Sequence, residues 1–277
     1  MTTTTVLEVT EPGIHPDMPE DVYHRDPVPG GSLSSSGARK LLETCPARFD
    51  YERRNPPPSR DEFDLGKAFH TKVLGTGAET VVCDFRDWKT KPAQEAKKAA
   101  YAAGKVPLLA HQAADVDAMT DAVRSHPIAG ALLSKGDVEQ SLFWTDDRTG
   151  IWRRARLDLL RTDAIVDLKS CESADGEHVA KAIARYGYHA QADFYLEGAR
   201  ALGLGELPFL FVFVEKRPPH LIHVVQLGPD ELAAGRHLNN RAIDRFAECQ
   251  RTGVWPGYAD DITTISLPPY ALRNLEY

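Results

Sequence analysis

The stretch RARLDLLRTDAIVDLKS, residues 154–170, contains two short apolar strands separated by a turn at residues 161–163. The turn residues favour a reversal of the chain, and the Leu, Ile and Val residues on either side favour strands. If the two strands pair as a hairpin, Asp158 of the first strand comes alongside Asp167 of the second. The stretch therefore predicts two carboxylates close together on one sheet.

The second strand also places a lysine beside these carboxylates. Side chains alternate between the two faces of a strand, so Asp167 and Lys169 point the same way while Leu168 points into the core. Two carboxylates and one amine at a sheet edge can hold a divalent metal next to a cation, which suits phosphodiester cleavage. The alternative is ordinary strand-end chemistry, because Asp often flanks turns and Lys often ends a strand in solvent. The position of Asp167 supports the metal site over an ordinary strand end, because a carboxylate within an apolar run is costly to bury without a partner.

The overall composition is that of a globular protein of 277 residues, with 42% hydrophobic and 26% charged residues. No apolar stretch approaches the length of a membrane span, and residues 1–10 lack the pattern of a secretory signal. The four cysteines lie far apart without a C-x-x-C pair, which argues against a zinc ribbon or a disulfide framework and fits a reducing cytoplasm. The net charge of −7 argues against nucleic-acid binding over the whole surface but allows a local basic groove.

Hydrophobic periodicity and turn residues divide the chain into expected elements. Helices are expected over residues 34–54 with a break at Pro46, 64–74, 88–104, 110–125, a short stretch after Pro127, 178–202 with a break near Gly187, and 229–251. Strands are expected over residues 80–84, 138–144, 151–160, 164–169, 208–215 and 221–226, and a last helical turn over 270–275. Residues 1–31 are expected to form an extended or partly disordered lead, and residues 32–277 a single domain. This order predicts an α/β (α+β) fold in which helices flank a mixed central sheet.

Four further residues stand at suitable positions around the expected hairpin. His70 lies on the helix expected over 64–74, although a lone helical histidine is more often an ordinary surface or core residue. Glu139 begins the strand that precedes Asp158, where an exposed strand-end glutamate is a competitive interpretation. Gln191 and Tyr195 are four residues apart and therefore share one helix face, where a polar side chain is less expected from packing alone.

Two arginines precede the first carboxylate on the same strand. Arg154 and Arg156 alternate with apolar residues, so both are expected on the face of Asp158. Basic side chains beside a metal site can hold DNA phosphates. A solvated strand face is an equally good interpretation.

Taken together, these segments resemble the PD-(D/E)xK nuclease superfamily, and more narrowly the exodeoxyribonuclease VIII (RecE) type of phage and prophage exonuclease. The matching segments are Gly66–His70, Val138–Ser141, Arg156–Asp158, Ile165–Ser170, Gln191–Tyr195 and Phe211–Lys216. The resemblance covers about residues 32–250 and implies a restriction-endonuclease-like core for this part of the chain.

The resemblance also implies a metal site. His70, Asp158, Asp167 and the Leu168 carbonyl would ligate Mg²⁺, with Mn²⁺ as an alternative ion. Lys169 would position or activate the attacking water and stabilise the developing charge.

The remaining candidates have supporting roles in such families. Gln191 and Tyr195 would support the site or the DNA strand, and Glu139 would join the catalytic set. No iron–sulfur cluster is expected, because the C-terminal third contains a single cysteine, Cys249.

The implied activity is a 5′→3′ exonuclease on linear double-stranded DNA that generates single strands for recombination. The implied partners are double-stranded DNA ends, a single-strand annealing recombinase and, in a homo-oligomeric ring, further copies of the chain. The expected location is the cytoplasm, that of a bacterial host if the protein is phage-encoded. Two alternatives stay open: a structure-specific or restriction-type endonuclease with the same metal site, and a catalytically inactive DNA-binding protein.

Overall fold

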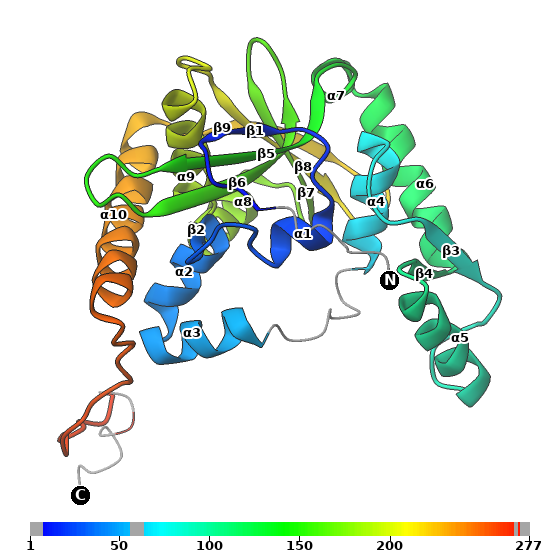
Figure 1. The fold of residues 1–277 in the computed structure, drawn as a ribbon. Coiled ribbons are helices and arrows are strands. Elements are labelled where there is room, and N and C mark those ends of the chain that lie inside the picture. The colour runs from blue at the N-terminus through cyan, green and yellow to red at the C-terminus, as the bar shows by residue number, and fades with distance from the viewer. Residues whose placement is uncertain (1–7, 56–63, 269–270, 272–277) are drawn as a thin grey trace, which may run out of the picture.

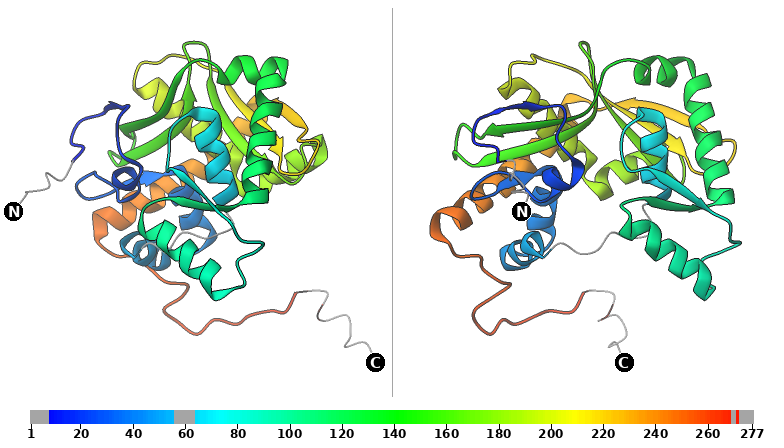
Figure 2. Two further views of the ribbon diagram at one scale, coloured as in Figure 1. Left: turned by 90° about the vertical axis from the view of Figure 1, so that its right-hand side faces the viewer. Right: turned by 45° about the vertical axis from the view of Figure 1, so that its right-hand side comes forward.

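A seven-stranded sheet with helices on both faces forms the centre of the computed structural model, which describes residues 8–55, 64–268 and 271 (Figures 1 and 2). The strands in order across the sheet are β1 (Gly13–His15), β5 (Asp137–Thr145), β6 (Trp152–Leu160), β7 (Ile165–Cys171), β8 (Phe209–Glu215) and β9 (Ile222–Gln226). β2 (Ser32–Ser34) pairs with β6 off this path. β7 and β8 are parallel, as are β2 and β6, while the other neighbours are antiparallel. The predicted mixed sheet is therefore confirmed.

The helices surround this sheet, and a small parallel pair of strands lies apart from it. The helices are α1 (Glu20–His24), α2 (Ser35–Glu43), α3 (Pro46–Arg54), α4 (Asp64–Leu74), α5 (Lys91–Ala102), α6 (Ala110–Ser125), α7 (Pro127–Leu133), α8 (Gly176–Tyr186), α9 (Tyr188–Ala201) and α10 (Pro229–Thr252). The parallel pair consists of β3 (Thr80–Cys83) and β4 (Val106–Leu109).

Two apolar cores fill the space between the sheet and its helices. One core packs α2, α3, α8, α9 and α10 against the sheet, with Leu41, Phe49 and Phe246 among its buried residues. The other packs α4, α6 and α7, with Phe69 and Met119 fully buried. Because both faces are covered, the central strands lie between two layers of helices, as Figure 2 shows.

β5, β6 and β7 form the expected antiparallel meander. The β5–β6 turn is closed by Asp146, whose N–H donates to the Ile151 carbonyl (2.9 Å) and whose carboxylate accepts from the Thr149 N–H (3.0 Å). Burial alternates along β6, so that Arg154, Arg156 and Asp158 are less buried than the apolar residues between them. The period of two that the sequence shows is thus the period of the strand.

The sheet divides between β6 and β7. Their ladder extends over two residue pairs next to the turn, Leu159↔Val166 and Leu160↔Ile165. Beyond these pairs β7 continues in parallel beside β8, whereas β6 continues between β5 and β2. We call the point of separation, at Asp158 and Asp167, the strand fork.

The breaks predicted within the helical segments are confirmed. The Ser34 hydroxyl accepts from the Gly37 N–H (3.1 Å) at the start of α2, and Pro46 is the first residue of α3. Gly187 separates α8 from α9 with φ +68°, a left-handed conformation that favours glycine.

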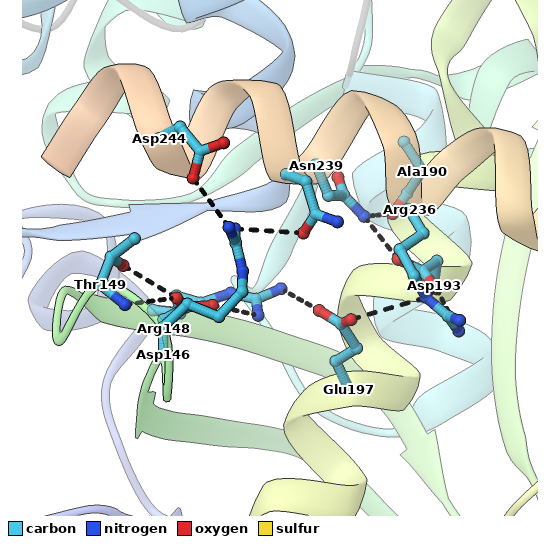
Figure 3. A network of polar contacts seen from close by, with 11 residues as sticks. Asp146, Arg148, Thr149, Ala190, Asp193, Glu197, Arg236, Asn239 and Asp244 are labelled. Atoms are coloured by element: carbon cyan, nitrogen blue, oxygen red, sulfur yellow. Dashed lines mark hydrogen bonds and ion pairs between the residues drawn. The ribbon is translucent and has the colours of Figure 1, made fainter. Parts of the chain in front are cut away.

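Helix α9 is fastened to α10 by the polar contacts of Figure 3. The Asn239 amide donates to the Ala190 carbonyl (2.9 Å) and to the Asp193 carboxylate (3.0 Å), and Arg236 forms an ion pair with Asp193 at 3.1 Å. Burial raises the pKa of Asp193, whereas these two partners favour its charged form. A Cβ added at Gly235 would lie 2.4 Å from the His189 carbonyl oxygen, so the helix backbones approach closely. The position of α9 over the sheet is therefore tightly defined.

The N-terminal segment differs from the extended or partly disordered lead predicted for residues 1–31. β1 pairs with β5 and α1 follows it, and Val9, Met18, Tyr23 and Val28 are buried around Phe143. Pro and Gly act here as turn formers within a packed segment, so the part of the lead that the structure describes belongs to the domain. Residues 1–7 lie outside the described residues.

Smaller differences concern short elements. β4 was not predicted, since Pro107 interrupts a run of four residues, and α5 is shorter than the helix expected over 88–104. The helical turn expected over 270–275 lies outside the described residues except for Ala271. Among residues 8–55, 64–268 and 271, no helix has both the length and the apolar character of a membrane span.

Candidate active site

The strand fork brings the two predicted carboxylates together. The Asp158 carboxylate accepts a hydrogen bond from the Leu168 N–H at 2.8 Å, in the place where a ladder partner on β6 would otherwise stand. The Asp158 side chain is 18% exposed and that of Asp167 is 2% exposed. The site therefore opens to solvent on the Asp158 side, while Asp167 lies at its base.

Asp167 is held from two directions. Its Oδ1 forms an ion pair with Lys169 Nζ, which confirms that these two side chains share a face of β7. Its Oδ2 accepts a hydrogen bond from Gln191 Nε2 of α9 at 2.7 Å. Both oxygens of the buried Asp167 carboxylate therefore have partners, Lys169 for Oδ1 and Gln191 for Oδ2.

The charges of this cluster are coupled. Burial and the nearby Asp167 carboxylate raise the pKa of Asp158 well above its usual range. Burial acts to lower the pKa of Lys169, but the carboxylates of Asp167 and Asp158 outweigh it and raise that pKa overall. Lys169 is therefore a cation at neutral pH, which suits charge stabilisation better than proton abstraction.

His70 on α4 lies at the open side of the site. Its Nδ1 is 3.6 Å from Asp158 Oδ2, and the ring interacts with the Leu168 backbone. Burial and the Lys169 charge lower the pKa of His70, so the imidazole is neutral and offers a lone pair. The structure thus places His70, Asp158, Asp167 and the Leu168 backbone in one neighbourhood, as the resemblance implied.

A divalent metal fits the chemistry of these donors. Hard carboxylate oxygens and a neutral imidazole suit Mg²⁺ or Mn²⁺, and a cation would relieve the repulsion between Asp158 and Asp167. In the described part of the chain, no three His, Cys, Asp or Glu side chains are already arranged as a metal-binding group. We therefore expect His70, Asp158 and Asp167 to adjust when a metal binds.

Helix α9 contributes a polar and aromatic wall. Gln191 donates to Asp167 and also interacts with the Tyr195 hydroxyl. Burial raises the pKa of Tyr195, so its hydroxyl stays protonated beside the carboxylates. The Tyr188 ring lies 5.0 Å from Lys169 Nζ, although Tyr188 was not among the predicted site residues. Its position three residues before Gln191, on the same helix face, could have identified it.

Glu139 flanks the site from β5. It stands between the pairs Val138↔Leu159 and Gln140↔Leu157, and is therefore opposite Asp158 in the register. Its charge raises the pKa of both His70 and Asp158, although it is a smaller influence than burial. Its carboxylate is ion-paired with Arg156, and its φ of +53° places its backbone in the left-handed region.

Arg154 and Arg156 have partners within the chain rather than free guanidinium groups. Arg154 contacts Asp26 (2.8 Å) and the Ser32 hydroxyl (2.7 Å). Arg156 pairs with Glu139 and donates to the Met18 carbonyl at 3.0 Å.

Both guanidinium groups also lie 5.5 Å from the Tyr23 ring. These contacts anchor the N-terminal segment against β6, and DNA-phosphate binding by Arg154 and Arg156 stays a prediction.

Residues 34–268 match the model of a family described as a PDDEXK-like domain of unknown function (DUF3799). The chain belongs to this PDDEXK-like family. The matched range includes all the residues of the site, and nucleases of the PDDEXK type generally use divalent metals. The family and the site together support a nuclease.

The fold of the PDDEXK-like domain recurs in a solved structure. The crystal structure of a "putative exonuclease" from Eubacterium rectale superimposes with a TM-score of 0.61, covering 87% of this chain and 92% of that chain. Since the two sequences are 14% identical, this likeness shows the fold alone. The crystal structure of SSO0001, at 13% identity over 73% of this chain and 98% of that chain, gives a TM-score of 0.29, too low for an argument. No curated protein matches the chain.

Proposed function

We propose that this PDDEXK-like domain is a Mg²⁺-dependent deoxyribonuclease that digests linear double-stranded DNA from its ends in the 5′→3′ direction. The observation that carries the proposal is the strand fork, where the Asp158 bond to the Leu168 N–H sets one carboxylate beside the Asp167–Lys169 pair. The name of the Eubacterium rectale neighbour supports exonuclease over endonuclease action. The RecE-type resemblance supports the polarity and a role in recombination.

The residues of the site have distinct tasks in this reaction. Asp158, Asp167, His70 and the Leu168 carbonyl would hold the metal, which when bound supplies Lewis-acid polarisation of the phosphate and a more acidic water. Gln191 keeps the Asp167 carboxylate oriented through its 2.7 Å hydrogen bond.

Lys169 places a positive charge where negative charge develops on the scissile phosphate. Its raised pKa keeps it protonated, so it stabilises charge and positions water rather than removing a proton. Tyr195 keeps its proton and can donate to a phosphate or a water at the wall of the site.

Further parts of the proposal rest on the resemblance. A single-strand annealing recombinase would receive the exposed strand, and a ring of several copies would enclose the duplex. The cytoplasm of a bacterial host is the compartment that this role implies.

Digestion of an end-labelled linear duplex tests the proposal. Parallel substrates carry a label at the 5′ or the 3′ end and are incubated with Mg²⁺, Mn²⁺ or EDTA. We expect metal-dependent release that begins at the 5′ end, and none with Asp167→Ala. Release that begins at the 3′ end would overturn the polarity, and equal digestion by wild type and Asp167→Ala would overturn the site. A covalently closed circle serves as the control, because its efficient cleavage would favour the endonuclease alternative.

A further inference from the structure

A row of aromatic rings leads from the core to the surface beside Lys169. Tyr188 packs against Phe211 and Phe213 of β8, with ring centroids 5.8 and 6.1 Å away. Tyr186 continues the row at 5.7 Å from Tyr188, with the two rings tilted by 35°. Tyr186 is 46% exposed, so the row ends in an aromatic surface open to solvent.

The junction that carries these rings is held in place. Gly187 links Tyr186 to Tyr188, and Arg39 Nη1 of α2 donates to the Tyr186 carbonyl at 2.6 Å. A Cβ at Gly187 would approach Arg39 Cδ to 3.3 Å, which shows how closely α2 covers the turn. The exposed ring is therefore presented by a fixed backbone rather than by a free loop.

Positive charge accompanies the exposed ring. The Arg185 guanidinium lies 5.5 Å from the centre of the Tyr186 ring. The Arg39 side chain is partly exposed beside the same turn, with its Nε 3.8 Å from the Glu43 carboxylate. In the middle of the row, Lys169 Nζ lies 5.0 Å from the Tyr188 ring. A planar aromatic surface with cations nearby matches a nucleotide, in which a flat base is attached to a phosphate backbone.

We propose that Tyr186 and Tyr188 form a nucleobase-stacking subsite next to the scissile phosphate. An unpaired base at the end of the DNA stacks on the Tyr186 ring, while Arg185 and Arg39 face the adjoining phosphates. Stacking on a ring tolerates any base, which suits an enzyme that digests DNA without regard to sequence. This subsite rests on the proposed nuclease function and extends it to the recognition of a frayed end.

Abasic nucleotides provide the test, because they keep the backbone and lack the stacking surface. One abasic nucleotide is placed in turn at each of the three terminal positions of either strand, and binding is measured by fluorescence anisotropy without divalent metal. For wild type we expect at least one position at which loss of the base weakens binding about fivefold or more.

Substitutions of Tyr186 test whether this ring is the one on which the base stacks. Tyr186→Ala should bind the intact and the abasic end equally, whereas Tyr186→Trp should keep the preference for the intact end. Tyr258→Ala is the matched control, since Tyr258 is 79% exposed in the C-terminal segment beside Arg48 of α3. Tyr258→Ala should retain the wild-type preference for the intact end. That result would show that the effect of Tyr186→Ala does not come from losing any exposed aromatic ring.

The outcomes separate the two proposals. A wild type that cleaves DNA but binds intact and abasic ends equally would overturn the subsite and leave the nuclease function standing. A Tyr186→Ala variant that keeps the full preference would also overturn the subsite. A wild type that neither binds nor cleaves DNA would overturn the nuclease function and the subsite with it.

Discussion

The two carboxylates at the strand fork stand in different electrostatic situations. Asp167 is compensated by Lys169 and Gln191, whereas Asp158 receives one backbone N–H and faces the Asp167 charge. Burial raises the pKa of Asp158, and the Asp167 charge raises it further. Without a metal, the ionised Asp158 carboxylate therefore destabilises the fold. Functional sites often reduce stability in this way.

The first prediction concerns Asp158→Asn in the metal-free protein. A carboxyl with a raised pKa binds its proton more tightly in the folded than in the unfolded state, so stability falls as pH rises from about 4 through the raised pKa. The uncharged amide introduced by Asp158→Asn removes this pH-dependent loss of stability. The variant should be more stable than the metal-free wild type at pH 7 by about 1–3 kcal/mol, and it should not cleave DNA.

Urea denaturation in EDTA from pH 4 to pH 8 measures the effect. Lys169→Met is the opposing control and should destabilise; identical pH profiles for wild type and Asp158→Asn would refute the account.

The second prediction concerns Lys169→Ala. The cation acts on charge that develops in the transition state, so its loss should lower kcat by roughly 10²–10³-fold. DNA affinity should change by less than about tenfold, because one phosphate contact among many contributes little to binding. Single-turnover cleavage and anisotropy measure the two quantities separately. An equal loss in both would assign Lys169 to binding.

Individual residues differed in how far the sequence could predict them. Asp158, Asp167 and Lys169 could be placed because strand alternation and a short turn are local properties. Arg154 and Arg156 could not, since their partners Asp26, Ser32 and Met18 are more than 120 positions earlier in the chain. Whether an arginine meets DNA or its own chain depends on this long-range packing.

At the scale of elements, the sequence was informative wherever an element is periodic and ends in strong signals. Pro46 and Gly187 mark helix ends that the structure confirms, and α2 begins within the helical segment expected over 34–54. β1 was missed because its three residues are too few to establish a period, and β4 because Pro107 interrupts its run of four. Their strand character comes from the neighbours with which they pair, β5 and β3.

The third prediction concerns the junction between α8 and α9. Gly187→Ala places a Cβ at φ +68° and 3.3 Å from Arg39 Cδ, so it should both destabilise the fold and displace α9, which carries Gln191. Gly203→Ala is the matched control, with φ +77° and no atom within 4 Å of the added Cβ. Both variants should lose about 1–2 kcal/mol of stability. Thermal denaturation measures the stability of each variant, and cleavage is assayed at a temperature at which both are folded. Gly187→Ala should cleave DNA more slowly than Gly203→Ala. Equal activities of the two variants would show that the turn does not position α9.

At the scale of the whole molecule, the N-terminal segment is part of the architecture rather than an appendage. β1 extends the sheet beyond β5, and the ring of Tyr23 in α1 lies 5.5 Å from the Arg156 guanidinium of β6. Figure 1 shows this segment crossing in front of β5 and β6. The predicted boundary at residue 31 therefore divides a continuous core.

The fourth prediction concerns a chain that begins at Gly31. It lacks Val9, Met18, Tyr23 and Val28, each of which is buried in the full chain. Each such side chain contributes about 1.5 kcal/mol or more, so we expect a large loss of stability and exposure of Phe143. Urea denaturation and binding of a hydrophobic dye measure these effects. Unchanged midpoints would show that the segment does not support the domain.

The bond between the Asp158 carboxylate and the Leu168 N–H has a consequence for amide hydrogen exchange. At this point a side chain, rather than a neighbouring strand, protects a backbone amide in the middle of the sheet. The exchange rate at Leu168 therefore reports where the carboxylate stands, and should rise in Asp158→Ala while the amides of β8 stay protected. If a bound metal draws the carboxylate away from this amide, exchange at Leu168 should rise in the same way.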